Sequence, residues 1–202
     1  MILNNYDSYL DVLSDILSLA YKYKYSLAAV ESRITKSFYF QTLVKNVDDP
    51  SLYKNKDLLI KEFFYDLPYK INLVDKYNEC YWASEAYLKI ISKTGCTFEV
   101  VFLYIPIEEM YNYFPIYHEM DFDQIINRFK ELFIHKSIIH KASKRLGYSL
   151  LDISKETDIP YPTLAALSTR KRDIRNLNGI SLYKLSQALH IQIESLLCDA
   201  KG

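Results

Sequence analysis

Residues that break helices are scarce in this sequence. Only four glycines and six prolines occur among 202 residues, so long stretches lack the turn residues that a fold of many short strands needs. Within these stretches, apolar side chains recur at the three- and four-residue spacing of a helix face. Half of the residues are hydrophobic and 25% are charged, as in an ordinary globular protein. We therefore expect an all-α protein.

Seven helical segments are expected before residue 147. Apolar spacing and capping residues place them at Ser8–Tyr25, Leu27–Lys45, Lys56–Tyr65, Asn78–Ser92, Thr97–Ile105, Ile107–Tyr113 and Asp123–Leu146, the last as one long helix or a pair. The segment 97–105 is ambiguous, because it is rich in the β-branched and aromatic residues of a buried strand. Its apolar residues nevertheless recur at i, i+3, i+4 and i+7 from Phe98, as on a helix face. A single strand would lack a partner, so we favour a helix.

Charge is distributed unevenly along the chain, although the net charge of the whole is zero. Residues 1–134 carry 14 Lys and Arg against 19 Asp and Glu, a net charge of −5. Residues 135–202 carry 11 against 6, a net charge of +5. An acidic front part followed by a basic C-terminal part predicts an anionic partner for the latter.

The cysteines and the N-terminus indicate the compartment. Cys80, Cys96 and Cys198 form no CxxC pair and are odd in number, which argues against a disulfide framework or a zinc finger. Buried, reduced thiols suit a cytosolic protein. The N-terminus lacks a basic start followed by an apolar run, and no run of 18 uncharged apolar residues occurs. We expect a cytoplasmic protein with no signal peptide and no membrane span.

Sequence motifs for catalysis are absent: there is no Walker loop, GxGxxG, HExxH or GxSxG. The segment Pro115–Asp123 gathers His118 with three carboxylates. No second cluster supplies further metal ligands at a recognisable spacing, and a connection between helices with an aspartate cap explains these residues better. We predict no metal, no cofactor and no enzymatic activity.

The segment that begins at Ser149 predicts two short helices joined by a tight turn. Ser149 is a suitable N-cap for a helix over residues 150–157, Asp158–Pro160 forms the turn, and a second helix covers Tyr161–Leu167. Four apolar side chains are placed to lock two such helices at a steep angle: Ile153, Ile159, Leu164 and Leu167. That angle lets the second helix enter the major groove of DNA.

Ser149–Leu197 resembles the Cro/lambda-repressor (XRE-like) helix-turn-helix family. The Asp-Ile-Pro-Tyr-x-Thr-Leu segment is similar to the centre of the family motif, Ser181–Leu189 looks like the fourth helix, and His190–Leu197 looks like the closing helix. With Phe133–Arg145 as first helix, the resemblance implies a lambda-repressor-like five-helix DNA-binding domain over residues 131–202. We expect the remaining residues, 1–130, to form a separate helical domain for dimerisation, sensing or partner binding.

The resemblance also implies a docking mode. Tyr161, Thr163 and Ala166 would face base edges, while the Ser149 hydroxyl and the amides at the helix starts would meet phosphates. The basic loop Ser168–Arg175 follows the second helix, where the family touches the DNA backbone. The predicted DNA-binding residues are Ser149, Pro160, Tyr161, Thr163, Ala166, Arg170, Lys171, Arg172, Arg175 and Ser181.

Some positions depart from the family pattern. Leu150 stands where a phosphate-contacting glutamine is frequent, and Asp158 stands where the turn often has glycine. Ala165 and Ala166 occupy positions where polar base-reading side chains are common. Few side chains therefore remain for bidentate base contacts, which gives the loop arginines or an interface with protein a larger part in the function.

Together these features predict a transcriptional regulator that binds double-stranded DNA as a homodimer, with repression of its own operon as the expected role. Two alternatives stay open. One is an antitoxin, or a phage-encoded inhibitor, whose residues 1–130 bind a protein target while the helix-turn-helix autoregulates. The other is a helix-turn-helix used only as a protein-interaction module.

Overall fold

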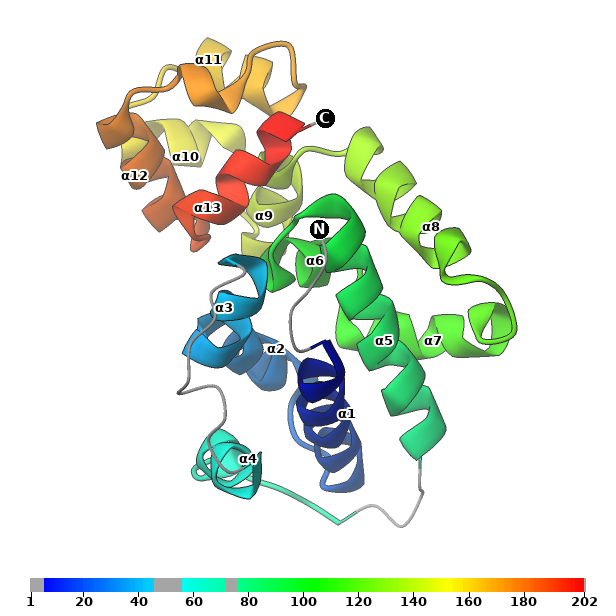
Figure 1. The fold of residues 1–202 in the computed structure, drawn as a ribbon. Coiled ribbons are helices and arrows are strands. Elements are labelled where there is room, and N and C mark those ends of the chain that lie inside the picture. The colour runs from blue at the N-terminus through cyan, green and yellow to red at the C-terminus, as the bar shows by residue number, and fades with distance from the viewer. Residues whose placement is uncertain (1–5, 46–55, 72–75, 202) are drawn as a thin grey trace. The chain divides into compact units, whose positions relative to one another are not determined.

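The computed structural model describes residues 6–45, 56–71 and 76–201. Every regular element in these residues is helical, with thirteen α-helices and two short 3₁₀ helices (Figure 1). The protein is therefore all-α. None of the helices described is long and apolar enough to cross a bilayer. The chain divides into two compact units, residues 1–126 and 127–202, with the division inside α8 (Phe122–His135).

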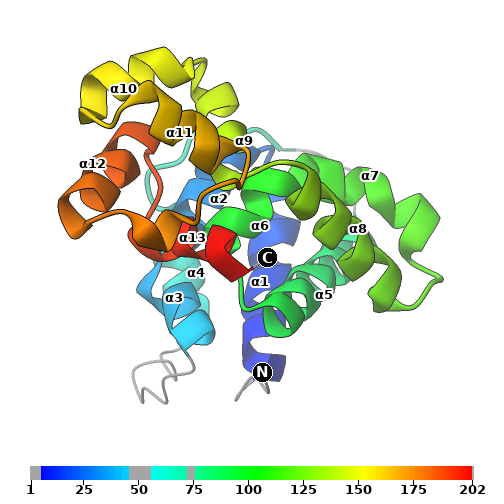
Figure 2. The ribbon, with the colours of Figure 1, turned by 90° about the horizontal axis from the view of Figure 1, so that it is seen from above.

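The first unit is organised around its two longest helices. α1 and α5 lie side by side (Figure 1 and Figure 2), and their buried faces include Leu13, Leu17 and Ile91, none of which has exposed surface. The other helices pack around this pair. The helices of this unit that precede α8 are α1 (Tyr6–Lys22), α2 (Leu27–Lys36), α3 (Phe38–Lys45), α4 (Lys56–Phe64), α5 (Tyr77–Thr94), α6 (Phe98–Tyr104) and α7 (Ile107–Tyr117).

The ambiguous segment 97–105 contains a helix, α6, as favoured from the sequence. The Thr97 hydroxyl oxygen caps its start by accepting the Val100 N–H at 3.3 Å. Every residue of α6 except Glu99 is buried. A helix that is apolar on all sides is stable only when other elements surround it, and α6 packs against both α2 and α5. This all-round burial explains why its composition resembles that of a buried strand.

The single helix expected over Leu27–Lys45 is wrong, because the chain breaks at Ser37. Ser37 has extended backbone (φ −66°, ψ 125°), and its N–H donates to the Arg33 and Ile34 carbonyls at the end of α2. Its own carbonyl accepts the Gln41 N–H at 3.0 Å in the first turn of α3. Serine is a weak residue for a helix interior, since its side chain competes for backbone hydrogen bonds. Because α3 takes a new direction after this break, the Phe40 side chain on α3 can be buried.

The second unit holds the end of α8 and five further helices. They are α9 (Ile138–Leu146), α10 (Leu150–Thr157), α11 (Tyr161–Ser168), α12 (Gly179–Leu189) and α13 (Ile193–Leu197), with 3₁₀ turns η2 (Ile174–Asn176) and η3 (Cys198–Lys201). The segment 123–146 is thus a pair of helices, and the Ser137 hydroxyl starts the second by accepting the His140 N–H at 3.1 Å. Each of the five helices contributes a side chain without exposed surface: Ile138, Ile153, Leu164, Leu185 and Leu196.

Three helices of this unit end at a residue in the left-handed region of backbone space. Gly147 closes α9 with φ 73°, Asp158 closes α10 with φ 59°, and His190 closes α12 with φ 52°. Glycine adopts this conformation freely, whereas a Cβ-bearing residue meets a steric penalty. Short connections between helices therefore impose backbone strain at Asp158 and His190.

Replacing the exposed His190 by glycine is expected to raise the free energy of unfolding by about 0.5–1 kcal/mol. The reason is that glycine removes the Cβ clash, and this gain exceeds the entropy that glycine adds to the unfolded chain. Urea unfolding of the full-length protein measures the change. His140→Gly, at an exposed helical position in α9, is the matched control and should lower stability by about 0.5–1 kcal/mol. A loss of stability in His190→Gly would contradict the argument.

Candidate nucleic-acid interface

α10 begins in a reciprocal capping box. The Ser149 hydroxyl oxygen accepts the Asp152 N–H at 3.2 Å, and the Ser149 N–H donates to Asp152 Oδ2 at 3.0 Å. The Ser149 hydroxyl itself donates to Asp152 Oδ2 at 2.6 Å. These hydrogen bonds hold the pKa of the Asp152 carboxyl below its usual value. The donation to phosphate predicted for Ser149 would therefore have to displace a carboxylate, so the structure uses this serine for capping.

The turn between α10 and α11 is fixed by side chains on both sides of Asp158. The Thr157 hydroxyl donates to the Ile153 carbonyl at 2.7 Å and accepts the Ile159 N–H at 3.3 Å. The Ser154 hydroxyl donates to the Ile159 carbonyl at 2.6 Å. With the buried Ile159 side chain as an anchor, these bonds satisfy both backbone polar groups of Ile159 within the protein.

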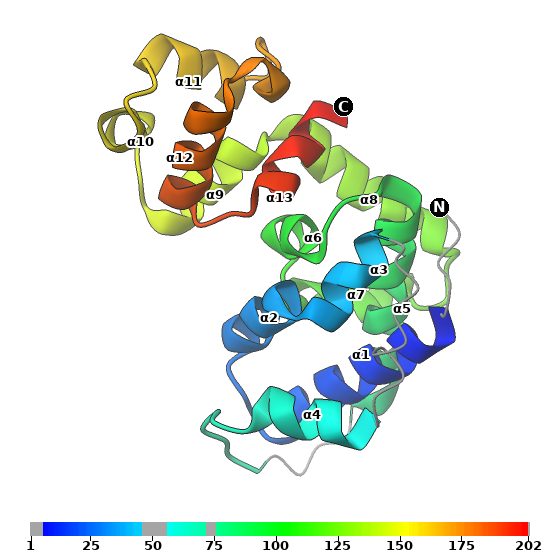
Figure 3. The same cartoon turned by 60° about the vertical axis from the view of Figure 1, so that its left-hand side comes forward.

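Asp158 also reaches α12 across the exposed side of the turn. Its Oδ2 lies 2.6 Å from Lys184 Nζ, and this hydrogen-bonded ammonium lowers the pKa of the Asp158 carboxyl. In Figure 3, α10 is seen almost along its axis while α11 runs across the view, so the two helices are steeply inclined to each other. This is the arrangement that a helix-turn-helix requires.

α11 presents a small and mostly apolar surface. Leu164 and Leu167 are buried where α11 packs against α9 and α10. Tyr161 is 49% exposed, and Thr163 and Ala166 are half-buried. Pro160 precedes the helix with φ −55° and ψ 135°, and it is exposed. The structure thus places the predicted residues of α11 along one short helix.

Arg170, in contrast, is bound within its own unit. Its guanidinium lies 2.6 Å from Asp199 Oδ1 and donates to the carbonyl oxygens of Ile134 at 2.7 Å and Lys136 at 3.3 Å. It also lies over the Phe133 ring, 4.9 Å from the centroid. The Asp199 side chain is only 4% exposed. The expectation that Arg170 contacts a DNA phosphate is therefore revised: its donors satisfy carbonyls at the end of α8 and a buried carboxylate.

Asp199 is the partner of Arg170 that sequence reasoning missed. Its other oxygen, Oδ2, accepts the Ile138 N–H at the start of α9 at 3.3 Å. Burial raises the pKa of this carboxyl, against the lowering effect of Arg170 and of the Ile138 N–H. No local pattern links positions 170 and 199, because a contact between residues 29 apart in sequence depends on the packing of the whole unit.

The other cations of the basic loop differ in their availability. Lys171 and Arg172 are exposed, and neither side chain has a hydrogen bond or ion pair with the part of the chain that the structure describes. Arg175 Nε lies 2.9 Å from Asp173 Oδ2, so this arginine is paired and lowers the pKa of the Asp173 carboxyl. Two of the four predicted cations, Lys171 and Arg172, are therefore ready for an anionic partner.

Ser181 lies inside α12, which starts earlier than the sequence indicated. The helix begins at Gly179, and Asn178 is its cap, accepting the Ser181 N–H through Oδ1 at 2.8 Å. The Ser181 amide is therefore already satisfied within the protein. Asn178 is a strong N-cap residue type, so reading it as a helix start would have found this boundary.

The acidic segment Pro115–Asp123 spans the end of α7 and the connection to α8. The His118 ring stacks on Phe114 with 4.4 Å between centroids, and Asp121 Oδ1 accepts the Asp123 N–H at 3.0 Å. These residues serve the ends of the two helices. Within residues 6–45, 56–71 and 76–201, no three His, Cys, Asp or Glu side chains are grouped to hold a metal ion.

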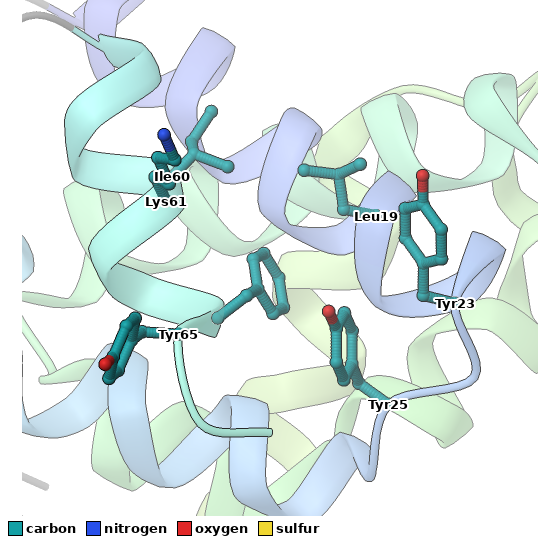
Figure 4. Close-up of a pocket in the computed structure, with 7 residues that line it drawn as sticks. Leu19, Tyr23, Tyr25, Ile60, Lys61 and Tyr65 are labelled. Carbon is teal, nitrogen blue, oxygen red and sulfur yellow. The ribbon is translucent and has the colours of Figure 1, made fainter. Parts of the chain in front are cut away.

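An open hollow of about 310 Å³ lies in the first unit, beside α4. Figure 4 shows Tyr23 and Tyr25 across the hollow from side chains of α4. The Tyr25 ring stacks on Phe64 with 4.5 Å between centroids, and Tyr65 is 91% exposed. The hollow is lined by Leu19, Tyr23, Tyr25, Ile60, Lys61, Phe64 and Tyr65. An exposed aromatic surface of this kind suits contact with another molecule.

Comparison of the chain with protein-family models, curated proteins and solved structures found no match. The functional argument therefore rests on the geometry of this chain. Two surfaces carry it: α11 with the adjacent Lys171 and Arg172, and the aromatic hollow beside α4.

Arg170→Ala is expected to lower the free energy of unfolding by about 3 kcal/mol, because it leaves the Asp199 carboxylate buried without its cation. Urea unfolding of full-length variants measures this loss. The double variant Arg170→Ala/Asp199→Ala should lose less stability than the sum of the two single variants. Unchanged stability together with a loss of DNA affinity in Arg170→Ala would contradict the structural role and restore the predicted phosphate contact.

Proposed function

We propose that residues 127–202 bind double-stranded DNA by placing α11 in the major groove, and that the protein is a cytoplasmic transcriptional regulator. The observation that carries the proposal is the α10–turn–α11 unit, in which α11 starts with the exposed Tyr161 and is followed within four residues by the unpaired Lys171 and Arg172. A recognition helix must stand clear of its own domain and must be oriented by contacts to phosphate. The exposed Tyr161 and the unpaired Lys171 and Arg172 support this role for α11.

Electrostatics supports the same conclusion. Residues 135–202 carry a net charge of +5, so an approaching polyanion gains energy before any specific contact forms. Each phosphate that is neutralised releases condensed counterions, which makes the affinity fall as salt rises. Lys171 and Arg172 lie at the end of α11 at which backbone contacts would orient the helix.

A homodimer follows from the size of the recognition surface. α11 has eight residues and covers too few base pairs to select one site in a genome, so a second copy on an adjacent half-site is needed. The simplest regulatory role is repression of the protein's own operon.

Binding is expected to be tight on DNA from the region upstream of the protein's own gene and weak on a scrambled duplex. Fluorescence anisotropy at two salt concentrations measures both affinities. Lys171→Ala/Arg172→Ala should weaken binding about tenfold to a hundredfold and reduce the salt dependence by about two phosphate contacts. Light scattering of the protein at tens of micromolar should give the mass of a dimer.

The matched control is Lys36→Ala/Lys93→Ala, which removes two exposed lysines from the first unit and should leave the affinity unchanged. An equal loss of DNA affinity in the control and the test variant would show that the effect comes from net charge alone and not from the position of Lys171 and Arg172. Absence of binding to either duplex at low salt would exclude the proposal, and a monomeric mass would exclude the dimer.

The aromatic hollow favours a second candidate function, in which the first unit binds a protein target. An antitoxin or a phage-encoded inhibitor has this plan, with the helix-turn-helix autoregulating. Large exposed aromatic side chains are frequent at protein interfaces, because they bury much area at a low cost in side-chain entropy. Tyr65 lines the hollow, and Ile71 directly follows Lys70, whose N–H donates to the Tyr23 carbonyl at 2.8 Å. Both side chains are largely exposed, so neither is needed for the core.

For this second function, the product of a neighbouring gene is expected to co-purify with the full-length protein. Tyr65→Ala/Ile71→Ala should weaken that association at least tenfold, because it removes apolar contact area without disturbing the core. Pull-down with titration calorimetry measures the change. Tyr183→Ala, which removes an exposed tyrosine from the second unit, is the control. A clean single species from the native host would argue against this function.

A further inference from the structure

The outward face of α11 is built from methyl and methylene groups. Leu164 and Leu167 point inward and have almost no exposed surface. At 100° per residue, the opposite side of the helix carries positions 162, 165, 166 and 169. These positions hold proline, alanine, alanine and threonine. Pro162 and Thr169 are exposed, and Ala165 and Ala166 are half-buried.

This face has little hydrogen-bonding capacity. Thr169 donates its hydroxyl to the Ala165 carbonyl at 2.9 Å, and Pro162 has neither an N–H nor a polar side-chain atom. None of the eight residues of α11 is Arg, Lys, Asn or Gln, the types that make bidentate contacts to guanine or adenine. At the flanks of this face, the hydroxyls of Tyr161 and Thr163 can offer polar contacts to bases.

An apolar, low-profile helix face is complementary to one feature of the major groove, the C5-methyl group of thymine. Alanine and threonine methyls contact this group directly, and no other unmodified base presents a methyl group there. We propose that Ala165 and Ala166 select thymine by contact between methyl groups, so that the protein reads its site chiefly through thymine methyls. This inference rests on the proposed DNA-binding function and names the chemistry of its specificity.

The charge beside this face identifies duplex DNA as the occupant. Lys171 and Arg172 follow α11 within four residues, are exposed and have no anionic partner in the described residues. A protein partner for an apolar helix face would bury such cations at a cost, whereas the phosphates that flank a major groove would pair with them.

The test replaces thymine by uracil, which pairs identically and lacks only the methyl group. The full-length protein selects its tightest sites from a library of randomised duplexes, and the recovered sequence is remade with uracil at each thymine in turn. Affinity should fall about fourfold at each contacted thymine, the effect of removing one buried methyl group from an interface. Fluorescence anisotropy measures the ratio of thymine to uracil affinity.

Two variants assign the effect to α11. Ala165→Ser/Ala166→Ser places hydroxyls on the face and should bring the thymine-to-uracil ratio close to one. Lys171→Ala should weaken binding to both duplexes equally and leave the thymine-to-uracil affinity ratio unchanged, because a contact to phosphate does not depend on the base methyl group. Unchanged melting temperatures show that both variants are folded.

The outcomes separate this inference from the function on which it rests. Salt-dependent, sequence-selective binding with equal affinity for thymine and uracil duplexes would overturn methyl reading and leave the regulator intact. A thymine-to-uracil ratio that survives in the serine variant would also overturn it. Failure to select any duplex at low salt would remove the DNA-binding function itself.

Discussion

The ion pair between Arg170 and Asp199 organises the C-terminal unit. Through one guanidinium it joins the loop after α11 to the carbonyl groups that end α8 and to a carboxylate of η3, which in turn caps α9 through the Ile138 N–H. The Asp199 carboxylate, which is only 4% exposed, would be costly to leave unsatisfied away from water. Because the Arg170 side chain binds the Asp199 carboxylate and the carbonyls at the end of α8 together, it holds the loop after α11 against the start of the unit. These contacts therefore help to position the candidate recognition helix.

The distribution of polar groups separates structural residues from the candidate interface. Ser149, Thr157 and Asn178 use their hydrogen bonds at helix ends and turns. What remains outward on α11 is a methyl-rich surface, and what remains outward beyond it is a pair of cations. A helix of this composition gains its affinity from phosphates and its selectivity from shape and apolar contact. The first unit offers a different surface, a hollow lined by the half-buried Tyr23 and Tyr25 and the exposed Tyr65.

Particular residues show how far sequence reasoning reached within the basic loop. Four cations in six residues predicted a phosphate-binding segment, and as local chemistry that reasoning was sound. The structure divides the four among an internal ion pair, a local pair with Asp173 and two exposed side chains. Such a division depends on which carboxylates the fold brings near. The sequence pattern also failed to predict the break at Ser37. The break allows Phe40 to be buried in α3, and that burial depends on packing against residues far away in the sequence.

By itself, the sequence determined that this protein is all-α and that a helix–turn–helix begins at Ser149, since apolar periodicity, capping residues and turn residues act within a few positions of each other. It also favoured a helix at α6 from spacing alone. Only the tertiary structure decided that α6 is enclosed on all sides and that Arg170 is bound within its own unit. Each of these depends on contacts between residues far apart in the chain, whose energies no local pattern contains.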